Sequence, residues 1–396
     1  MSTIDQRPTN LPPHADLDAL PDVAAFLAER ADRHDRDGSF PAEGIARVHE
    51  AGLLTATVAE RYGGPGLGLA ATARILRALG AGDPSVALVT AMTLFTHAAQ
   101  AAGGQWPEHY YRQLLEDCAT APALVNALRV EPDLGSPARG GLPATTARAD
   151  GDSWSLTGHK IFSTGAVGLR WMAVWARTDE DPARVGSFLV RADSPGIAIE
   201  PTWDHLGLRA SRSDDVVFDG VRIPRDAVSG LVDPAAPDPR RDPGLAAWNN
   251  LGLTALYLGV AEAAQQWLIG FLQERTPSAL GKPLAALPRF QNEVGETQAA
   301  LLAATDLVDG LARRFDAADP LAAAHAPAAK LIGTRAAIDC VQRAVALIGN
   351  NGLTRANPLQ RHLRDVLCAR VHTPQDDSIT AALGQAALGR AAGGRG

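Results

Sequence analysis

The residue pattern of this chain changes twice, and this change constrains the fold more than any other feature. Residues 21–122 and 235–388 are rich in alanine and leucine, and their apolar positions recur at helical spacing. Residues 123–234 instead contain short runs of β-type residues separated by frequent turn signals. The pattern predicts a helical N-terminal domain, a middle domain built as a compact antiparallel barrel or sandwich, and a C-terminal helical bundle, which together make an α+β fold.

The two ends of the chain and its composition narrow the class of protein. Residues 1–20, with three prolines, and residues 389–396, rich in glycine and arginine, are expected to be flexible. The net charge is −7 and no basic block occurs, which argues against nucleic-acid binding. No apolar run reaches the roughly 18 residues needed to span a bilayer, and the N-terminus has no signal-peptide core. Three scattered cysteines fit a reducing compartment, so we expect a cytoplasmic enzyme that binds neither membrane nor nucleic acid.

Several common catalytic motifs do not occur in the sequence. No glycine-rich nucleotide-binding loop has the required strand-to-helix context, and no HExxH motif is present. The histidines, cysteines and acidic residues do not fall at metal-ligand spacings, so no metal site is expected.

Six segments, taken in chain order, carry a resemblance to a known family. They resemble the signature segments of the acyl-CoA dehydrogenase fold superfamily and together cover about residues 20–390. The segments are FP at 40–41 with EAGLL at 50–54 and ERYGG at 60–64, EPDLGS at 131–136, GHKIFSTGA at 158–166, LGLRASRSDD at 206–215 with VRIP at 221–224, GNNGL at 349–353, and RHLRD at 361–365.

The resemblance implies a subunit with a helical N-terminal domain, a middle antiparallel β-barrel and a C-terminal four-helix bundle. It implies a flavin in the cleft between the domains, expected to be FAD with FMN as the alternative. The flavin diphosphate would be held partly by a neighbouring subunit of a homotetramer built as a dimer of dimers. The residues that the resemblance assigns to the flavin are Val130, Gly135, Ser136, Phe162, Thr164, Arg275, Gly349 and Asn350.

The chemistry of these residues suits the roles that the resemblance implies. Ser136 can donate a hydrogen bond to a phosphate, and Arg275 can pair with the diphosphate. Thr164 can bond the edge of the flavin ring and Phe162 can pack against its face. The N–H groups of the loop at 349–350 can meet phosphates or the adenosine half. Taken alone, Ser136 also fits a turn, Phe162 a core position and Arg275 a solvated helix.

The sequence departs from the dehydrogenases at the position of the catalytic base. Such enzymes need a carboxylate over the flavin to remove the α-proton of an acyl thioester. In the family this base follows the C-terminal Arg-Asp pair by eight residues, which gives Thr373, or lies on a helix position that aligns with Asn249. Neither side chain can act as a base. Asp376 and Asp377 lie about one helical turn later and are the candidates for a displaced base.

The segment at residues 370–374, RVHTP, instead resembles flavin monooxygenases on the same fold, of the dibenzothiophene monooxygenase and amino-sugar N-hydroxylase types. In those proteins a histidine here takes part in oxygen chemistry, which makes His372 a candidate catalytic residue. The same resemblance places His97 on the substrate side and Ser163 near the oxygen. The alternatives are a surface histidine for His372, a satisfied core histidine for His97, and a strand hydroxyl facing its neighbour for Ser163.

We therefore expect a flavin-dependent oxidoreductase, and specifically a two-component monooxygenase. Reduced flavin would come from a separate NAD(P)H-dependent flavin reductase, because the chain has no NAD(P)H-binding fingerprint. After reaction with O2, a C4a-hydroperoxide would transfer oxygen to a small organic substrate. One alternative is an acyl-CoA dehydrogenase or oxidase that performs α,β-desaturation with Asp376 or Asp377 as its base. Another is a non-catalytic subunit that keeps the fold.

Overall fold

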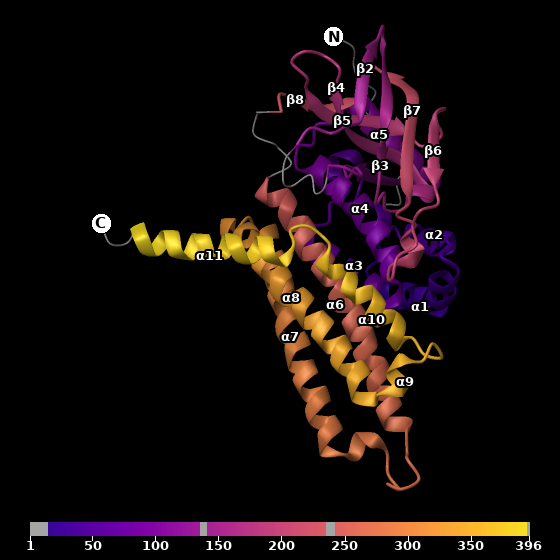
Figure 1. Cartoon of the computed structure of the whole chain (residues 1–396), viewed down its shortest axis with the longest axis vertical. Coiled ribbons are helices and arrows are strands. Elements are labelled where there is room, and N and C mark those ends of the chain that lie inside the picture. The colour runs from indigo at the N-terminus through magenta and orange to yellow at the C-terminus, as the bar shows by residue number, and fades with distance from the viewer. Residues whose placement is uncertain (1–14, 135–140, 235–241, 394–396) are drawn as a thin grey trace.

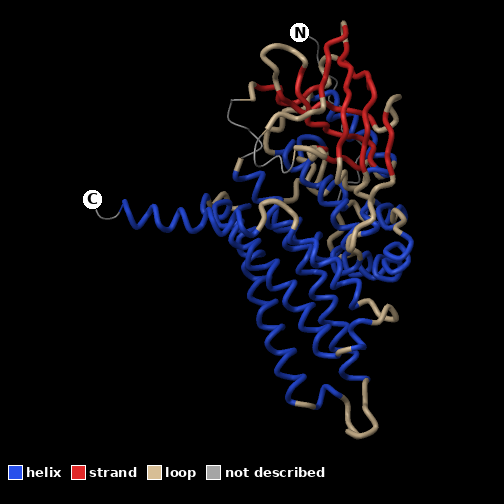
Figure 2. Tube along the Cα trace, in the orientation of Figure 1, coloured by secondary structure: helices blue, strands red, loops and turns tan. Residues whose placement is uncertain are grey.

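The computed structural model of the chain describes residues 15–134, 141–234 and 242–393. Helices come first, then a β-sheet, then a bundle of long helices (Figures 1 and 2). The sheet lies at one end of the elongated molecule, and the bundle extends to the other end (Figure 1). The predicted α+β class, with helical parts before and after a β region in the sequence, is confirmed. In the described ranges, no helix combines the length and the apolarity that a membrane crossing requires.

Five α-helices precede the sheet in the part of the chain that the structure describes. Asp83 begins the fourth of them, because its carboxylate accepts hydrogen bonds from the N–H groups of Ser85 at 2.8 Å and Val86 at 3.4 Å. Pro84 occupies the first turn, where no N–H is needed. The helices are α1 (Leu20–Asp37), α2 (Ala42–Glu50), α3 (Leu69–Gly82), α4 (Pro84–Ala101) and α5 (Glu108–Thr120).

The middle part of the chain forms an eight-stranded sheet whose path is β6-β7-β3-β2-β4-β5-β8, with β1 paired to β4 off this path. Most neighbouring strands are antiparallel, as expected. The strands are β1 (Leu124–Leu128), β2 (Thr146–Asp150), β3 (Ser153–Lys160), β4 (Leu169–Thr178), β5 (Val185–Arg191), β6 (Ile197–Glu200), β7 (Asp215–Pro224) and β8 (Val228–Val232).

The sheet differs from the predicted closed antiparallel barrel in two respects. First, β1 and β2 each pair with β4 in parallel, so the sheet is mixed. Second, its edge strands β6 and β8 do not pair with each other among the described residues. The register shows why two strands share one partner: Leu124 faces Leu169 and Thr146 faces Arg177, so β1 and β2 lie end to end along β4. Strand direction depends on the path of long connections, which the alternation of residues does not report.

Three long helices of the C-terminal part, α6, α7 and α8, pack against one another, and the shorter α10 packs against α6 and α8. The helix α11 projects away from the bundle (Figure 1). It continues to Gly393, so part of the tail expected from residue 389 is helical, in keeping with its alanine-rich sequence. The bounds are α6 (Pro243–Glu274), α7 (Pro288–Asp316), α8 (Pro320–Ile348), α9 (Asn350–Leu353), α10 (Leu359–Leu367) and α11 (Asp376–Gly393).

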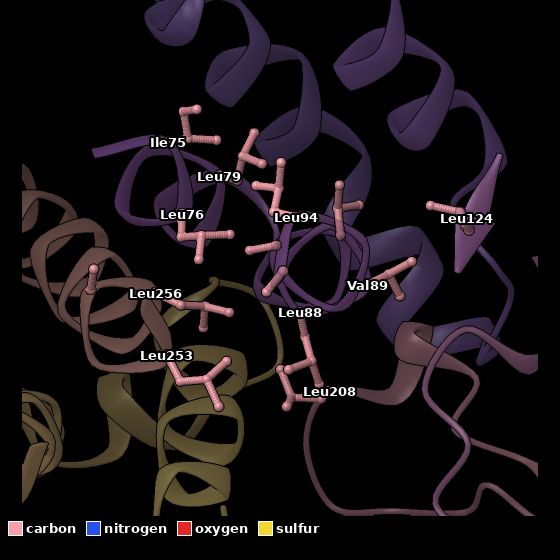
Figure 3. Packing of buried hydrophobic residues seen from close by; sticks show 14 of the residues in the cluster. Ile75, Leu76, Leu79, Leu88, Val89, Leu94, Leu124, Leu208, Leu253 and Leu256 are labelled. Atoms are coloured by element: carbon pink, nitrogen blue, oxygen red, sulfur yellow. The ribbon is translucent and has the colours of Figure 1, made fainter. Parts of the chain in front are cut away.

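Two glycines bring α3 and α6 into close contact. A methyl group at Gly80 would lie 2.2 Å from the carbonyl oxygen of Leu256, and one at Gly259 would lie 2.0 Å from that of Arg77. Buried leucines of α3, α4 and α6, among them Leu76, surround this contact in one continuous core (Figure 3). The N-terminal helices and the bundle are therefore parts of one packed body rather than separate globules.

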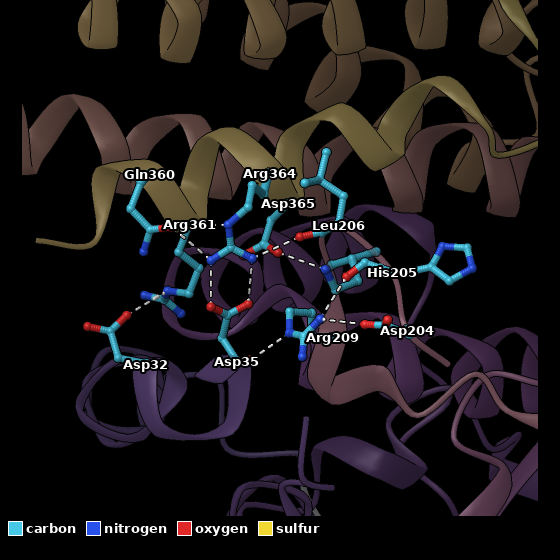
Figure 4. Close-up of polar contacts among 11 residues, drawn as sticks. Asp32, Asp35, Asp204, His205, Leu206, Arg209, Gln360, Arg361, Arg364 and Asp365 are labelled. Atoms are coloured by element: carbon cyan, nitrogen blue, oxygen red, sulfur yellow. Dashed lines mark hydrogen bonds and ion pairs between the residues drawn. The ribbon is translucent and has the colours of Figure 1, made fainter. Parts of the chain in front are cut away.

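A polar network joins α1, α10 and the loop that follows β6 (Figure 4). Arg364 of α10 forms a two-pronged ion pair with Asp35 of α1, with N–O distances of 2.8 and 2.5 Å. The same guanidinium donates to the carbonyl oxygen of Leu206 at 2.8 Å. The next residue, Asp365, accepts a hydrogen bond from the N–H of Leu208 at 2.7 Å. One turn of α10 thus holds the first helix and a loop of the middle part together.

Burial raises the pKa of Asp365 to about 7, although the nearby Arg361 opposes the shift. An aspartate in an unfolded chain has a pKa of about 3.9. Between about pH 4 and pH 7, the Asp365 carboxyl is therefore protonated in the folded protein and ionised in the unfolded chain. The free energy of unfolding contributed by Asp365 therefore falls as the pH rises through this window.

Asp365→Asn is expected to remove this pH dependence, because an amide does not ionise and its oxygen can still accept from Leu208. Relative to the native protein, the free energy of unfolding of the variant should rise by up to about 1.4 kcal/mol per pH unit between about pH 4 and pH 7. Urea denaturation of both proteins at several pH values measures the difference. Parallel pH profiles for the two proteins would contradict the account.

Candidate active site

The loop that follows β3 presents Phe162 to the outside. Phe162 adopts a left-handed backbone with φ of 55°, and its side chain is 52% exposed. Its ring meets those of Trp203 and His205 edge-on, with centroid distances of 6.3 and 5.8 Å. The loop is fixed to the neighbouring segment because the N–H of Gly165 donates to the carbonyl oxygen of Ser211 at 2.8 Å. A large aromatic ring is therefore held at the surface by a rigid backbone.

Polar groups on the same loop lie beside this ring. Thr164 Oγ1 accepts a hydrogen bond from Ser213 Oγ at 3.1 Å, and its carbonyl oxygen accepts one from Asn126 Nδ2 at 3.1 Å. Ser163 Oγ is buried and has no hydrogen-bond partner among the described residues. A buried hydroxyl without a partner is costly unless a ligand completes it. An exposed aromatic ring, a fixed threonine and an unpartnered hydroxyl suit the flat heteroaromatic ring of a flavin.

The residues predicted upstream of this loop are only partly described. Val130 lies beside the loop, because its carbonyl oxygen accepts a hydrogen bond from the N–H of Ile161 at 3.0 Å. Gly135 and Ser136 lie outside the described residues. Among the described residues before and after them, the carboxylate of Glu131 accepts a hydrogen bond from the N–H of Ala144 at 2.6 Å.

Glu131 also forms a fully buried ion pair with Lys160 at the end of β3. The distance from Lys160 Nζ to Glu131 Oε1 is 2.6 Å, and Nζ also donates to the carbonyl oxygen of Trp175 at 2.5 Å. Burial lowers the pKa of Lys160 to about 8, while Glu131 opposes this shift. Glu131 and Lys160 belong to the EPDLGS and GHKIFSTGA segments of the sequence, but nothing in the residues near either one predicts that they form a pair.

The segment with His372 lies between α10 and α11 and rests on the bundle. His372 Nε2 lies 2.7 Å from Tyr257 Oη of α6, and the carbonyl oxygen of His372 accepts a hydrogen bond from Lys330 Nζ of α8 at 3.1 Å. Burial, with a contribution from Lys330, lowers the pKa of His372 to about 4. Tyr257 and Lys330 were missed by sequence reasoning, because a lone tyrosine and a lone lysine on apolar helices read as ordinary helix residues.

His97 lies in a different environment, fully buried in α4. Its Nδ1 lies 3.0 Å from Tyr111 Oη of α5, and its Nε2 is buried with no partner among the described residues. Burial lowers the pKa of His97 to about 4. The contacts of His97 come from α5, whereas those of His372 come from α6 and α8.

The residues predicted for the diphosphate lie far from the Phe162 loop in a single chain. Arg275 follows the last residue of α6 and is exposed, and Gly349 and Asn350 are exposed at the start of α9. Figure 1 places both of these points toward the end of the bundle that faces away from the sheet. One subunit therefore does not bring all of the predicted cofactor residues together.

The two positions at which family dehydrogenases carry their base lie side by side. Asn249 Nδ2 donates a hydrogen bond to the carbonyl oxygen of Thr373 at 2.8 Å. Asp376 is engaged elsewhere, in an ion pair with Arg335 at 2.9 Å, and Asp377 is exposed. Across residues 15–134, 141–234 and 242–393, no three His, Cys, Asp or Glu side chains gather as metal ligands would.

Lys160→Met is expected to destabilise the protein by about 3–5 kcal/mol, because it leaves the Glu131 carboxylate buried without its countercharge. The double variant Lys160→Met/Glu131→Gln removes both charges and should recover part of this loss. Urea denaturation of the two variants and the native protein measures the effect. A Lys160→Met variant as stable as the native protein would show that the ion pair does not stabilise the fold.

Comparisons with known proteins identify the family and the fold of the chain. Family models described as acyl-CoA dehydrogenase N-terminal, middle and C-terminal domains match residues 22–109, 129–221 and 251–376. The putative acyl-CoA dehydrogenase YdbM of Bacillus subtilis (strain 168) is 32% identical over 362 residues, which cover 90% of this chain and 92% of that protein.

Two solved structures show how the same fold is used elsewhere. KijD3, solved with FMN and a dTDP-linked amino-keto sugar, is 27% identical with a TM-score of 0.82 and 97% coverage of both chains. FMN-bound TdsC from Paenibacillus sp. A11-2, a dibenzothiophene monooxygenase, has a TM-score of 0.84 over 95% of this chain and 98% of its own, at 21% identity, which shows the fold alone. The resemblance that the sequence motifs indicated is confirmed. The chain belongs to the acyl-CoA dehydrogenase family.

Proposed function

We propose that this chain is the oxygenase component of a two-component flavin monooxygenase acting on a small organic substrate. Bound reduced flavin would supply the activation of O2. The observation that carries the proposal is the contact between Asn249 and Thr373. Both positions available for a dehydrogenase base meet at one place, and neither holds a carboxylate. The residue before Thr373 is His372, whose imidazole lies 2.7 Å from Tyr257 Oη of α6, the helix that also carries Asn249.

The state of His372 supports a hydrogen-bonding role. With a pKa of about 4, its ring is uncharged near neutral pH and is a weak base there. A neutral imidazole offers one donor and one acceptor nitrogen. Since Nε2 is bonded to Tyr257, the nitrogen left for a ligand is Nδ1. His97 and Ser163, each with a buried polar atom that has no hydrogen-bond partner among the described residues, are the further proposed contacts for substrate or oxygen.

The proposed cofactor is FAD, with FMN as the alternative. Phe162 and Thr164 would hold its ring, and Val130, Gly135 and Ser136 would lie alongside. Arg275 and the loop at Gly349 and Asn350 would reach the diphosphate of a neighbouring subunit. In one chain the ends of α6 and α8 lie away from the sheet (Figure 1), which supports a contribution from a neighbouring subunit; the proposed assembly is a homotetramer built as a dimer of dimers. The reduced flavin would come from a separate NAD(P)H-dependent reductase.

The alternative is an acyl-CoA dehydrogenase or oxidase, which the names of the sequence relatives favour. The ion pair of Asp376 with Arg335 and the exposure of Asp377 count against either residue as its base. Anaerobic mixing of the flavin-loaded chain with acyl-CoAs of several chain lengths tests this directly. We expect no bleaching of the flavin, because neither Asn249 nor Thr373 offers a carboxylate to remove the α-proton. Bleaching that Asp376→Asn or Asp377→Asn abolishes would establish the alternative.

His372→Ala is expected to impair oxygen chemistry far more than flavin binding. Reduced flavin-loaded protein is mixed with oxygenated buffer, and the lifetime of any transient absorbance and the hydrogen peroxide released are recorded. Loss of one hydrogen bond to a reacting group predicts a lifetime about 10- to 100-fold shorter and faster release of peroxide. His325→Ala, at an exposed histidine of α8, is the matched control. Equal loss of flavin affinity and lifetime, or no change in either, would contradict the assignment of His372.

A further inference from the structure

Two side chains of the bundle hold His372 from two directions. Tyr257 Oη of α6 lies 2.7 Å from Nε2 of the ring, and the two rings lie 5.7 Å apart between centroids. Lys330 Nζ of α8 donates to the carbonyl oxygens of His372 at 3.1 Å and Pro374 at 2.8 Å. The ring is therefore fixed through its nitrogen, and the backbone that carries it is fixed on both sides.

The hydroxyl of Tyr257 determines which nitrogen of His372 carries the proton. Tyr257 is 1% exposed, and burial, aided by Cys368 and Asp365, raises its pKa well above the usual value, so the phenol keeps its hydrogen. Within the described part of the chain, the hydroxyl has Nε2 of His372 as its hydrogen-bond partner. If Nε2 carried the hydrogen, the buried O–H would have no acceptor among the described residues, so the contact favours donation from the O–H to Nε2, with the hydrogen of the neutral ring on Nδ1.

Lys330 keeps the imidazole neutral. Lys330 is 1% exposed, and its positive charge adds to the effect of burial in lowering the pKa of His372. The pKa of Lys330 is itself lowered by burial, which Asp376 at the start of α11 partly opposes. A second positive charge on the imidazole beside this ammonium is thus disfavoured.

We propose that Tyr257 and Lys330 are positioning residues that present His372 as a fixed Nδ1–H hydrogen-bond donor to an acceptor oxygen or nitrogen of the bound flavin. Neither side chain needs to touch the ligand, because both act through His372. The use of this donor rests on the proposed function. The tautomer follows from the contacts of the chain itself, so it can be tested separately.

The first test measures the tautomer by solid-state NMR on the flavin-loaded full chain, with its ten histidines labelled with 15N and 13C. The His372 signal is assigned by its loss in His372→Gln. The native protein should show one Nδ1–H tautomer. Tyr257→Phe removes only the hydroxyl and should give a mixture in which Nε2–H is populated. Tyr110→Phe, which removes a hydroxyl bonded to Asp226 at 2.9 Å, is the control and should change nothing.

Two results of this test would overturn the inference. One is an Nε2–H tautomer or a mixture in the native protein. The other is a His372 signal that Tyr257→Phe leaves unchanged.

The second test concerns Lys330. In Lys330→Met the pKa of His372, followed by NMR against pH, should be higher than in the native protein. His97 in the same sample is an internal control, because its low pKa arises from burial alone. Lys330→Arg, which keeps the charge, should restore the native value, so a variant that merely loosens the fold is recognised. An unchanged pKa of His372 in a folded Lys330→Met would remove Lys330 from the proposal.

A kinetic readout separates this inference from the proposed function. When the reduced flavin-loaded chain meets O2, Tyr257→Phe should shorten the transient about threefold to tenfold, less than His372→Ala does. If Tyr257→Phe mixes the tautomers but leaves the lifetime unchanged, while His372→Ala shortens it, the positioning role is wrong and the proposed function stands. If the native protein gives no transient, the proposed function fails, and the NMR result still decides the tautomer.

Discussion

The structure depends on one turn of α10, where Arg364 and Asp365 connect parts of the chain that are distant in sequence. Arg364 reaches Asp35 of the first helix, and Asp365 holds the backbone of the loop after β6. That loop carries His205, whose ring points away from the network in Figure 4 and meets Phe162 edge-on. The contact that fixes the arrangement of the domains therefore also fixes the surroundings of the proposed flavin face.

The position of His372 also depends on the packed core, because the helix α6 carries Tyr257, which contacts it. Gly259 lets α6 approach α3 so closely that a methyl group at this position would clash with the backbone of α3. Tyr257, two residues earlier, contacts His372 from a different face of α6. Close packing of α6 against α3 thus limits the movement of the hydroxyl that holds the imidazole. The candidate site is built from segments that the core immobilises, which suits a donor that must be oriented before a ligand arrives.

Much of the fold and part of the site could be predicted from the sequence. The change from helical to β-type patterning located the sheet, and short ordered motifs pointed to Phe162 and His372. The parallel pairing of β1 and β2 with β4 could not be predicted, because alternation reports which face a residue takes and not the direction of its neighbour. Tyr257 and Lys330 were missed because they lie on helices far along the chain from His372, and only folding brings them to it. The roles assigned to the site residues, His372, His97, Ser163 and Phe162 among them, stay predictions.

The central claim is that the residues around His372 serve oxygen chemistry rather than removal of a proton from an acyl thioester. Rapid mixing of the reduced, flavin-loaded chain with oxygenated buffer, without substrate, tests it most directly. The account predicts a transient absorbance that belongs to neither reduced nor oxidised flavin and that decays faster in His372→Ala. A featureless return to oxidised flavin, together with anaerobic bleaching by an acyl-CoA, would contradict it.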